Sequence, residues 1–328
     1  MTPRFAHRAV AATLLALAAS PSAASAAAAE PAPAAPAPAS MTLSLEGVGG
    51  HPLFAPAGAR ITVRGSVSPY LAGQAVQLTL TLQGHRFAVE SVPVAPAEAG
   101  KGTFHATFRS RYAGLLRIRA AHAPTPQQGA FTATAAPVRL VNTDVALGAS
   151  GFSVGVLQSE LAGLHYAVPL SGSFEEGTAN ALIAYRKMTG QQLVGTAGRK
   201  VFELLARGAG SFHVRYRDDG RHVEANLTTQ VLALIEPGGR VHAIYTTSSG
   251  KPSTPTVLGR FRVYLKTPGV NSEGMVDSNY FIRGYAIHGY PEVPTYAASH
   301  GCLRVPIPDA PAIYAWVREG TPVDVYYQ

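Results

Sequence analysis

The residues best suited to chemistry lie close together near the end of the chain. Residues 285–306 read YAIHGYPEVPTYAASHGCLRVP and hold His288, His300 and Cys302, the only cysteine. A thiol is mostly un-ionised at neutral pH because its ordinary pKa is about 8.5, so a nucleophilic cysteine needs a base or a cation beside it. A neighbouring imidazole supplies either. The spacing therefore predicts a thiol nucleophile activated by histidine.

The glycine before the cysteine adds a second expectation. Gly301 permits a backbone conformation closed to other residues, so the amides of Gly301 and Cys302 would converge on one point. Two such donors would form an oxyanion hole, and losing one donor costs roughly 3 kcal/mol of transition-state stabilisation in comparable sites.

The cysteine and the two histidines are also compatible with a structural role or with metal binding. A lone cysteine is often a small buried apolar residue. His288, His300 and Cys302 would also supply three ligands to zinc. A catalytic zinc site would need an acidic general base, and the nearest candidate, Glu292, lies in a proline-flanked loop. We therefore expect no metal and no cofactor.

The segment HGYPEVPTYAASHGCLR resembles the signature of the L,D-transpeptidase (YkuD-like) catalytic domain. The shared pattern is an upstream His-Gly, then Ser-His-Gly-Cys, then Arg two residues on. The segment TPTVLGRF at 254–261 is similar to the Thr-Pro-rich lead-in strand of those domains. The resemblance covers residues 215–328 and implies a mostly β catalytic domain there.

The resemblance also implies roles for the catalytic positions. Cys302 would be the nucleophile and His288 the general base, with the carbonyl of Gly289 orienting its imidazole. His300 and Gly301 would flank the oxyanion site.

Three further positions would act on the substrate side. Ser299 would fix the loop, and Arg304 would meet a substrate carboxylate or anchor the turn. Tyr290 would contact the substrate. Residues 266–284, which are Gly-rich and polar before their aromatics, would border or cover the groove. The alternative for that segment is an ordinary surface connection.

The reaction implied is a two-step acyl transfer on peptidoglycan stem peptides. The cysteine would attack the carbonyl of the third residue, a diamino acid, and terminal D-alanine would leave. An amine on a second stem or a wall protein would then take the thioester, giving a 3-3 cross-link or an attached protein. Water as acceptor would make the protein an L,D-carboxypeptidase, and a catalytically dead domain would leave a wall-binding scaffold.

The elements that position this site are predicted to be mainly strands. Residues 230–249 form two apolar runs around a Pro-Gly-Gly turn at 237–239, which predicts a β-hairpin. PDAPAIYAWVREG predicts one short helix, and TPVDVYY a final strand.

Two further domains are expected ahead of the catalytic one. Residues 41–140 alternate apolar and polar side chains in several short runs separated by turn signals, which predicts an immunoglobulin-like β-sandwich without paired cysteines. Residues 144–210 have helical periodicity and resemble a peptidoglycan-binding helical module. Ser171 and Arg186 depart from the usual pattern of that module, so a purely structural spacer is the alternative.

The N-terminus predicts export. Residues 1–26 have two arginines, an apolar run and an Ala-Ser-Ala cleavage site, which is typical of a signal peptide, and an uncleaved anchor is the alternative. Residues 27–40 form a Pro/Ala-rich linker. The net charge of +8 favours contact with anionic wall polymers, but no run of basic residues suggests nucleic-acid binding. We expect a monomer in the cell wall or periplasm.

Overall fold

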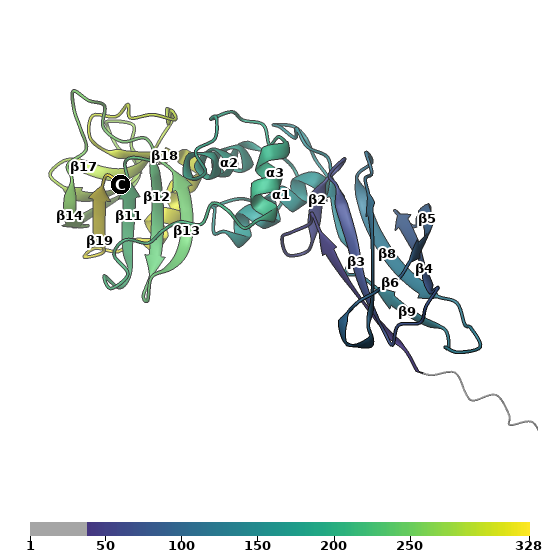
Figure 1. Ribbon diagram of the computed structural model, residues 1–328. Coiled ribbons are helices and arrows are strands. Elements are labelled where there is room, and N and C mark those ends of the chain that lie inside the picture. The colour runs from purple at the N-terminus through teal and green to yellow at the C-terminus, as the bar shows by residue number, and fades with distance from the viewer. Residues whose placement is uncertain (1–37) are drawn as a thin grey trace, which may run out of the picture.

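The computed structural model describes residues 38–328, in which three packed units follow one another along an elongated molecule (Figure 1). This part of the chain is mainly β and has four α-helices. Within it, no helix has the length and apolar character needed to cross a bilayer. The expected signal peptide at 1–26 and most of the expected linker at 27–40 lie outside the described residues.

The first unit consists of two β-sheets around a shared core. Its strands are β1 (Ser40–Glu46), β2 (Phe54–Pro56), β3 (Ile61–Ser68), β4 (Ala75–Leu82), β5 (His85–Pro93), β6 (Ala95–Pro96), β7 (Gly102–Phe108), β8 (Gly114–His122), β9 (Phe131–Thr134) and β10 (Val138–Val141). One sheet has the order β1-β3-β7-β6, and the other β2-β10-β8-β4-β5 with β9 paired to β8. Alternate residues of β3, such as Ile61 and Val63, are buried between the sheets, as a two-residue period requires.

The second unit is built from three helices, α1 (Phe152–Gly163), α2 (Glu176–Met188) and α3 (Arg199–Ala206). The two residues that depart from the expected module pattern both anchor loops here. Arg186 donates to the carbonyl of Gln192, 2.9 Å away, and to that of Thr196. Ser171 donates to Glu175 at 2.7 Å.

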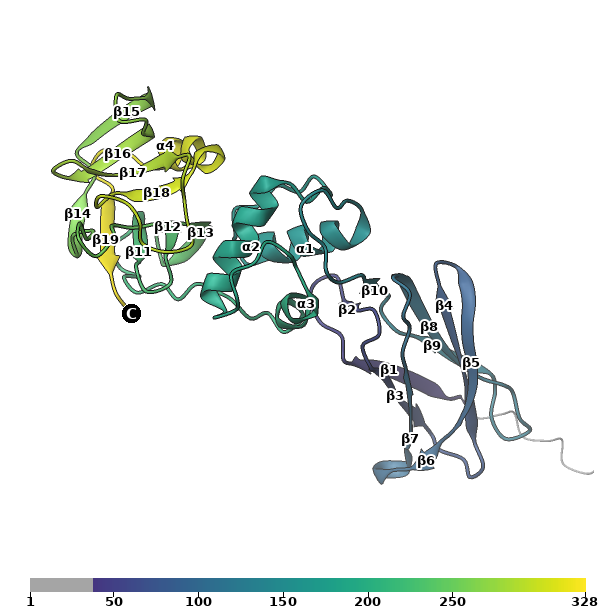
Figure 2. The same ribbon diagram turned by 90° about the horizontal axis from the view of Figure 1, so that it is seen from above.

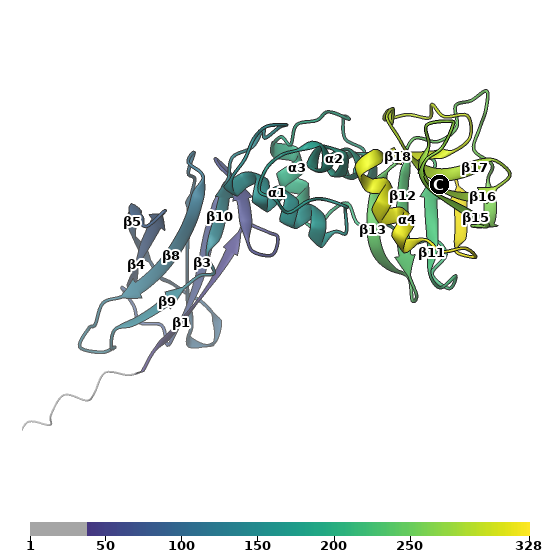
Figure 3. The ribbon, with the colours of Figure 1, turned by 180° about the vertical axis from the view of Figure 1, so that it is seen from behind.

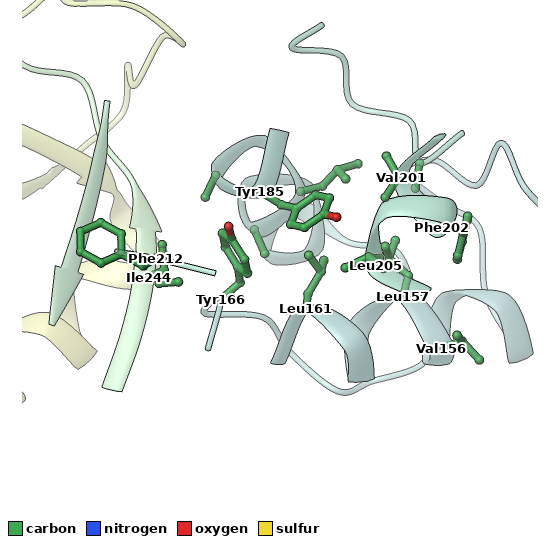
Figure 4. Packing of buried hydrophobic residues seen from close by; sticks show 14 of the residues in the cluster. Val156, Leu157, Leu161, Tyr166, Tyr185, Val201, Phe202, Leu205, Phe212 and Ile244 are labelled. Atoms are coloured by element: carbon green, nitrogen blue, oxygen red, sulfur yellow. The ribbon is translucent and has the colours of Figure 1, made fainter. Parts of the chain in front are cut away.

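The core of the helical unit continues into both of its neighbours. Phe54 of β2 meets Phe202 of α3 edge to face, with ring centroids 6.4 Å apart. On the other side Tyr166 lies between the helices and Ile244 of the third unit (Figure 4). The Ile244 amide donates to the His165 carbonyl at 2.8 Å, which extends the contact through the backbone. The three units therefore share continuous packing.

The third unit holds the remaining strands and the fourth helix. They are β11 (His222–Asn226), β12 (Val231–Glu236), β13 (Arg240–Thr246), β14 (Gly259–Arg262), β15 (Leu265–Val270), β16 (Val276–Ile282), β17 (Tyr285–Tyr290), β18 (Leu303–Pro306), α4 (Ala310–Trp316) and β19 (Pro322–Tyr326). Strands β12 and β13 form the expected hairpin. A five-stranded sheet, β13-β12-β11-β19-β14, packs against a four-stranded sheet, β15-β16-β17-β18 (Figure 2). Helix α4 lies beside the sheets on the side of β13 (Figure 3).

The shared core yields a stability prediction. Phe202 is fully buried, so Phe202→Ala should leave a cavity and lower the free energy of unfolding by about 3–5 kcal/mol. Phe152, in the same unit, is 45% exposed, and Phe152→Ala should change that free energy by no more than about 0.5 kcal/mol. Denaturant unfolding measures both. Equal effects of the two substitutions would contradict the assignment of Phe202 to the junction core.

Candidate active site

Two neighbouring parallel strands bring the predicted catalytic residues together. In the pairing of β17 with β18, His288 lies opposite Arg304 and Ile287 opposite Leu303. Cys302 directly precedes β18, and its side chain and that of His288 line the same cavity. A cavity of about 660 Å³ opens there. It is lined by Glu273, Met275, Tyr280, Arg283, Gly284, Tyr285, His288, Tyr290, Ser299, His300, Cys302 and Arg304.

Ser299 holds the turn that presents the thiol. Its hydroxyl donates to the Cys302 carbonyl at 2.7 Å and accepts the Gly301 amide at 3.0 Å. Gly301 has φ +122°, in the region that favours glycine, and a Cβ there would lie 1.7 Å from the Tyr285 ring. The residue before the cysteine therefore has to be glycine both for its backbone and for the space it leaves.

One amide of the expected oxyanion hole is already used. Because the Gly301 N–H donates to Ser299, it is not free to bind a substrate oxygen in this conformation. The Cys302 amide is left as the remaining donor of the pair. The expectation of two converging amides thus differs from the structure, because the serine hydroxyl in the same turn competes for one of them.

His288 is buried and its tautomer is fixed. Its Nδ1 lies 2.9 Å from the Gly289 carbonyl, which can only accept, so Nδ1 carries the proton and Nε2 is the basic nitrogen. Burial lowers the pKa of His288, with a further decrease from the positive charge of Arg304, while the Gly289 carbonyl opposes both. Gly289 itself allows α4 to approach, since a Cβ there would lie 2.8 Å from Cβ of Ala310.

Cys302 is partly buried, and its surroundings favour the neutral thiol. Sγ lies 3.7 Å from the Gly284 carbonyl, to which the S–H donates. Burial raises the pKa of this thiol above its ordinary value, and this effect outweighs the opposing contributions of the Ala286 amide and Arg304. The depressed imidazole pKa and the raised thiol pKa both favour a neutral pair over an ion pair.

The remaining predicted residues lie around the mouth of the cavity. The Arg304 guanidinium stacks on the Tyr290 ring with its Cζ 4.0 Å from the ring centroid, and Tyr290 in turn meets His288 edge to face. The exposed His300 has Nε2 3.3 Å from Nζ of Lys251. All the predicted site residues except Gly289 and Gly301 line the cavity.

Residues 266–284 border the cavity as part of the β15–β16 hairpin and the turn after it. The hairpin tip is held by Asn271, whose Oδ1 accepts the amides of Glu273 and Met275 at 3.1 and 2.9 Å. Both of these residues line the cavity, as do Gly284 and Tyr285. The sequence pattern marked none of these four individually. The Gly-rich character of 266–284 was the signal for Glu273, Met275 and Gly284, and Tyr285 begins the segment 285–306 that holds the histidines and the cysteine.

No three His, Cys, Asp or Glu side chains come together in the part of the chain described here in a way that could hold a metal ion. The structure therefore does not group His288, His300 and Cys302 as ligands.

Comparisons with known proteins show what the part of the chain around this cavity is similar to. The sequence model of the YkuD family, the L,D-transpeptidase catalytic domain, matches residues 220–325. A crystal structure of an L,D-transpeptidase from Xylanimonas cellulosilytica is 31% identical, with a TM-score of 0.52. The match covers 56% of this chain and 98% of that one. An L,D-transpeptidase structure from Stackebrandtia nassauensis is 23% identical over 56% of this chain and 95% of that one, with a TM-score of 0.36.

No curated protein matches in a sequence search. The family match nevertheless falls on the strands and the turn that build the cavity, and the 31% identical structure is matched over nearly its whole length. The chain therefore belongs to the L,D-transpeptidase family, with its YkuD catalytic domain at residues 220–325.

Proposed function

We propose that this protein is a cysteine-dependent acyltransferase that acts on peptidoglycan stem peptides, with Cys302 as nucleophile and His288 as general base. One observation carries the proposal. The thiol and an imidazole whose Nδ1–H is tied to Gly289 face the same cavity, so the free Nε2 is the atom able to take the thiol proton.

Acylation begins from the neutral pair. Nε2 of His288 takes the proton from Sγ as sulfur attacks the carbonyl carbon of the third stem residue. The Cys302 amide donates to the oxyanion that forms. As the intermediate collapses, the carbon–nitrogen bond to terminal D-alanine breaks and the imidazolium returns the proton to the departing amine. The product is a thioester on Cys302.

Deacylation repeats these steps with a new amine. The acceptor nitrogen loses a proton to Nε2 and attacks the thioester carbonyl, and the carbon–sulfur bond breaks. Sulfur leaves as thiolate and takes back the proton from the imidazolium. A second stem peptide gives a 3-3 cross-link, and a wall protein gives an attached chain.

Arg304 is proposed to recognise the carboxylate of the donor's terminal D-alanine. Its guanidinium lies at the cavity, and stacking on Tyr290 fixes the plane in which it donates. Ser299 has a different role, since both of its contacts are within the turn. Its hydroxyl holds the turn in place.

We also propose roles for the other parts of the chain. We assign the two-sheet unit to the immunoglobulin-like architecture and the three-helix unit to the peptidoglycan-binding type of module. The protein is proposed to be exported, to act as a monomer, and to meet anionic wall polymers through its basic charge.

The nucleophile is tested by intact mass. Incubating the protein with a tetrapeptide-bearing muropeptide or a carbapenem should give an adduct on Cys302. Cys302→Ala should lose the adduct completely, because no second thiol is present. His105→Gln, which alters an exposed histidine on β7 of the first unit, should keep it. An adduct that persists in Cys302→Ala would contradict the assignment of Cys302 as the nucleophile. A wild-type protein that binds sacculi without ever being acylated would favour the scaffold alternative.

The neutral resting pair makes a separate prediction about pH. Because burial raises the pKa of Cys302, alkylation by iodoacetamide should be slow at pH 7 and increase only above the pH at which a free cysteine ionises. The pH profile of the alkylation rate measures this. Fast alkylation that continues down to pH 6 would instead indicate a thiolate–imidazolium ion pair.

The role of Arg304 can be isolated by changing the substrate. Converting the terminal carboxylate of the donor to an amide should lower kcat/KM of the wild-type enzyme about 10–100-fold, the worth of a charged hydrogen bond. Arg304→Gln should show the same loss with the normal donor and little further loss with the amide. Independent, additive losses would mean that Arg304 only anchors the turn.

A further inference from the structure

The buried amine of Lys187 connects the helical unit to the third unit, which contains the active-site cavity and is called the catalytic unit below. Lys187 lies at the end of α2 and is 8% exposed. Its Nζ donates to the carbonyls of Gln230 and Thr247, each 2.9 Å away, and to the Thr246 hydroxyl at 2.8 Å. An ammonium has three N–H donors, and all three are used on residues of the catalytic unit.

Two of these acceptors, Thr246 and Thr247, belong to a segment, residues 246–251, that carries the catalytic turn. The Thr247 hydroxyl donates to the Arg304 carbonyl at 2.8 Å, and Ser248 exchanges two backbone hydrogen bonds with Arg304, both at 3.0 Å. The Ser249 carbonyl accepts the Ser299 amide at 2.9 Å. We call residues 246–251 the support segment.

A second connection runs through Gln230. Its side-chain amide donates to the Ser249 hydroxyl at 2.8 Å, and its Oε1 accepts the Ser249 amide at 2.8 Å. Lys187 therefore holds the support segment directly at Thr246 and Thr247, and at Ser249 through Gln230. Ser299, which the segment holds, fixes the carbonyl of Cys302.

We propose that Lys187 is a positioning residue, through which the helical unit holds the support segment and the turn of Cys302 in the reactive geometry. The expected effect of Lys187 on the acylation rate rests on the proposed function. Its expected effect on the structure of the turn does not. Burial lowers the pKa of Lys187 to about 7, so its placement is costly, and its three matched acceptors offset that cost. The helical unit then serves the chemistry in addition to any binding role.

Hydrogen exchange tests the structural half of the inference in the full-length protein. Lys187→Met keeps an unbranched side chain but removes the three donors. Exchange should become faster in peptides covering 246–251 and 296–304 and stay unchanged in β4 and β8. Lys200→Met, which removes an exposed lysine from the same unit, should change neither. Unchanged exchange in 296–304 would overturn the proposal.

A milder variant covers the case in which Lys187→Met does not fold. Thr246→Val removes one acceptor of the amine and nearly keeps the side-chain volume. It should accelerate exchange in the same two peptides by a smaller factor. If Thr246→Val folds and leaves 296–304 unchanged, the proposed coupling from the amine to the turn is wrong.

Acylation kinetics test the functional half. Small displacements of a nucleophile are costly, so Lys187→Met should lower the maximal acylation rate roughly tenfold or more and leave the half-saturating donor concentration nearly unchanged. In Lys187→Ala, added propylamine should restore part of the rate by supplying the missing ammonium. A folded Lys187→Met protein with the wild-type rate would overturn the positioning role. If the wild-type protein is itself never acylated, the proposed function fails, while the exchange experiment still decides the coupling.

Discussion

Burial of the thiol and the imidazole in one cavity is the constraint on which the rest of the site depends. Both side chains lose solvation, which lowers the pKa of His288 and raises the pKa of Cys302, so burial favours a neutral pair over an ion pair. Their relative position has to be set by the backbone. The parallel pairing of β17 with β18 and the two hydrogen bonds of Ser299 supply that position without charge.

The sequence predicted the chemical groups better than their surroundings. Cys302 and His288 stand out because few residue types can act as a nucleophile and a base. Gly301 stands out because glycine adopts backbone conformations that are closed to other residues. Gly284 contributes only a carbonyl, which any residue has, so no pattern could mark it. The hydrogen bond from the Gly301 amide to the Ser299 hydroxyl could not be predicted either. A hydroxyl two residues away can accept from that amide or point in another direction.

The strands and helices were predictable for a simpler reason. Alternation such as Ile61 and Val63 records which face of a strand is buried, and the helical stripes of 144–210 do the same for helices. Periodicity does not say which unit covers a stripe. Short helices such as α3 bury little surface by themselves, so Tyr166 and Phe202 pack against other units. That packing depends on tertiary structure, which the pattern does not contain.

The continuous core has a mechanical consequence for the active site. The support segment at 246–251 begins at Thr246, the last residue of β13, and β13 also pairs through Ile244 with residues of the helical unit. A rigid helical unit therefore fixes the strand from which the segment emerges, and Lys187 fixes the segment itself. A neutral thiol with no ionic attraction to its proposed base would depend on such backbone support. On the proposed function, a unit that holds none of the reacting groups would then contribute to the geometry of the reacting atoms.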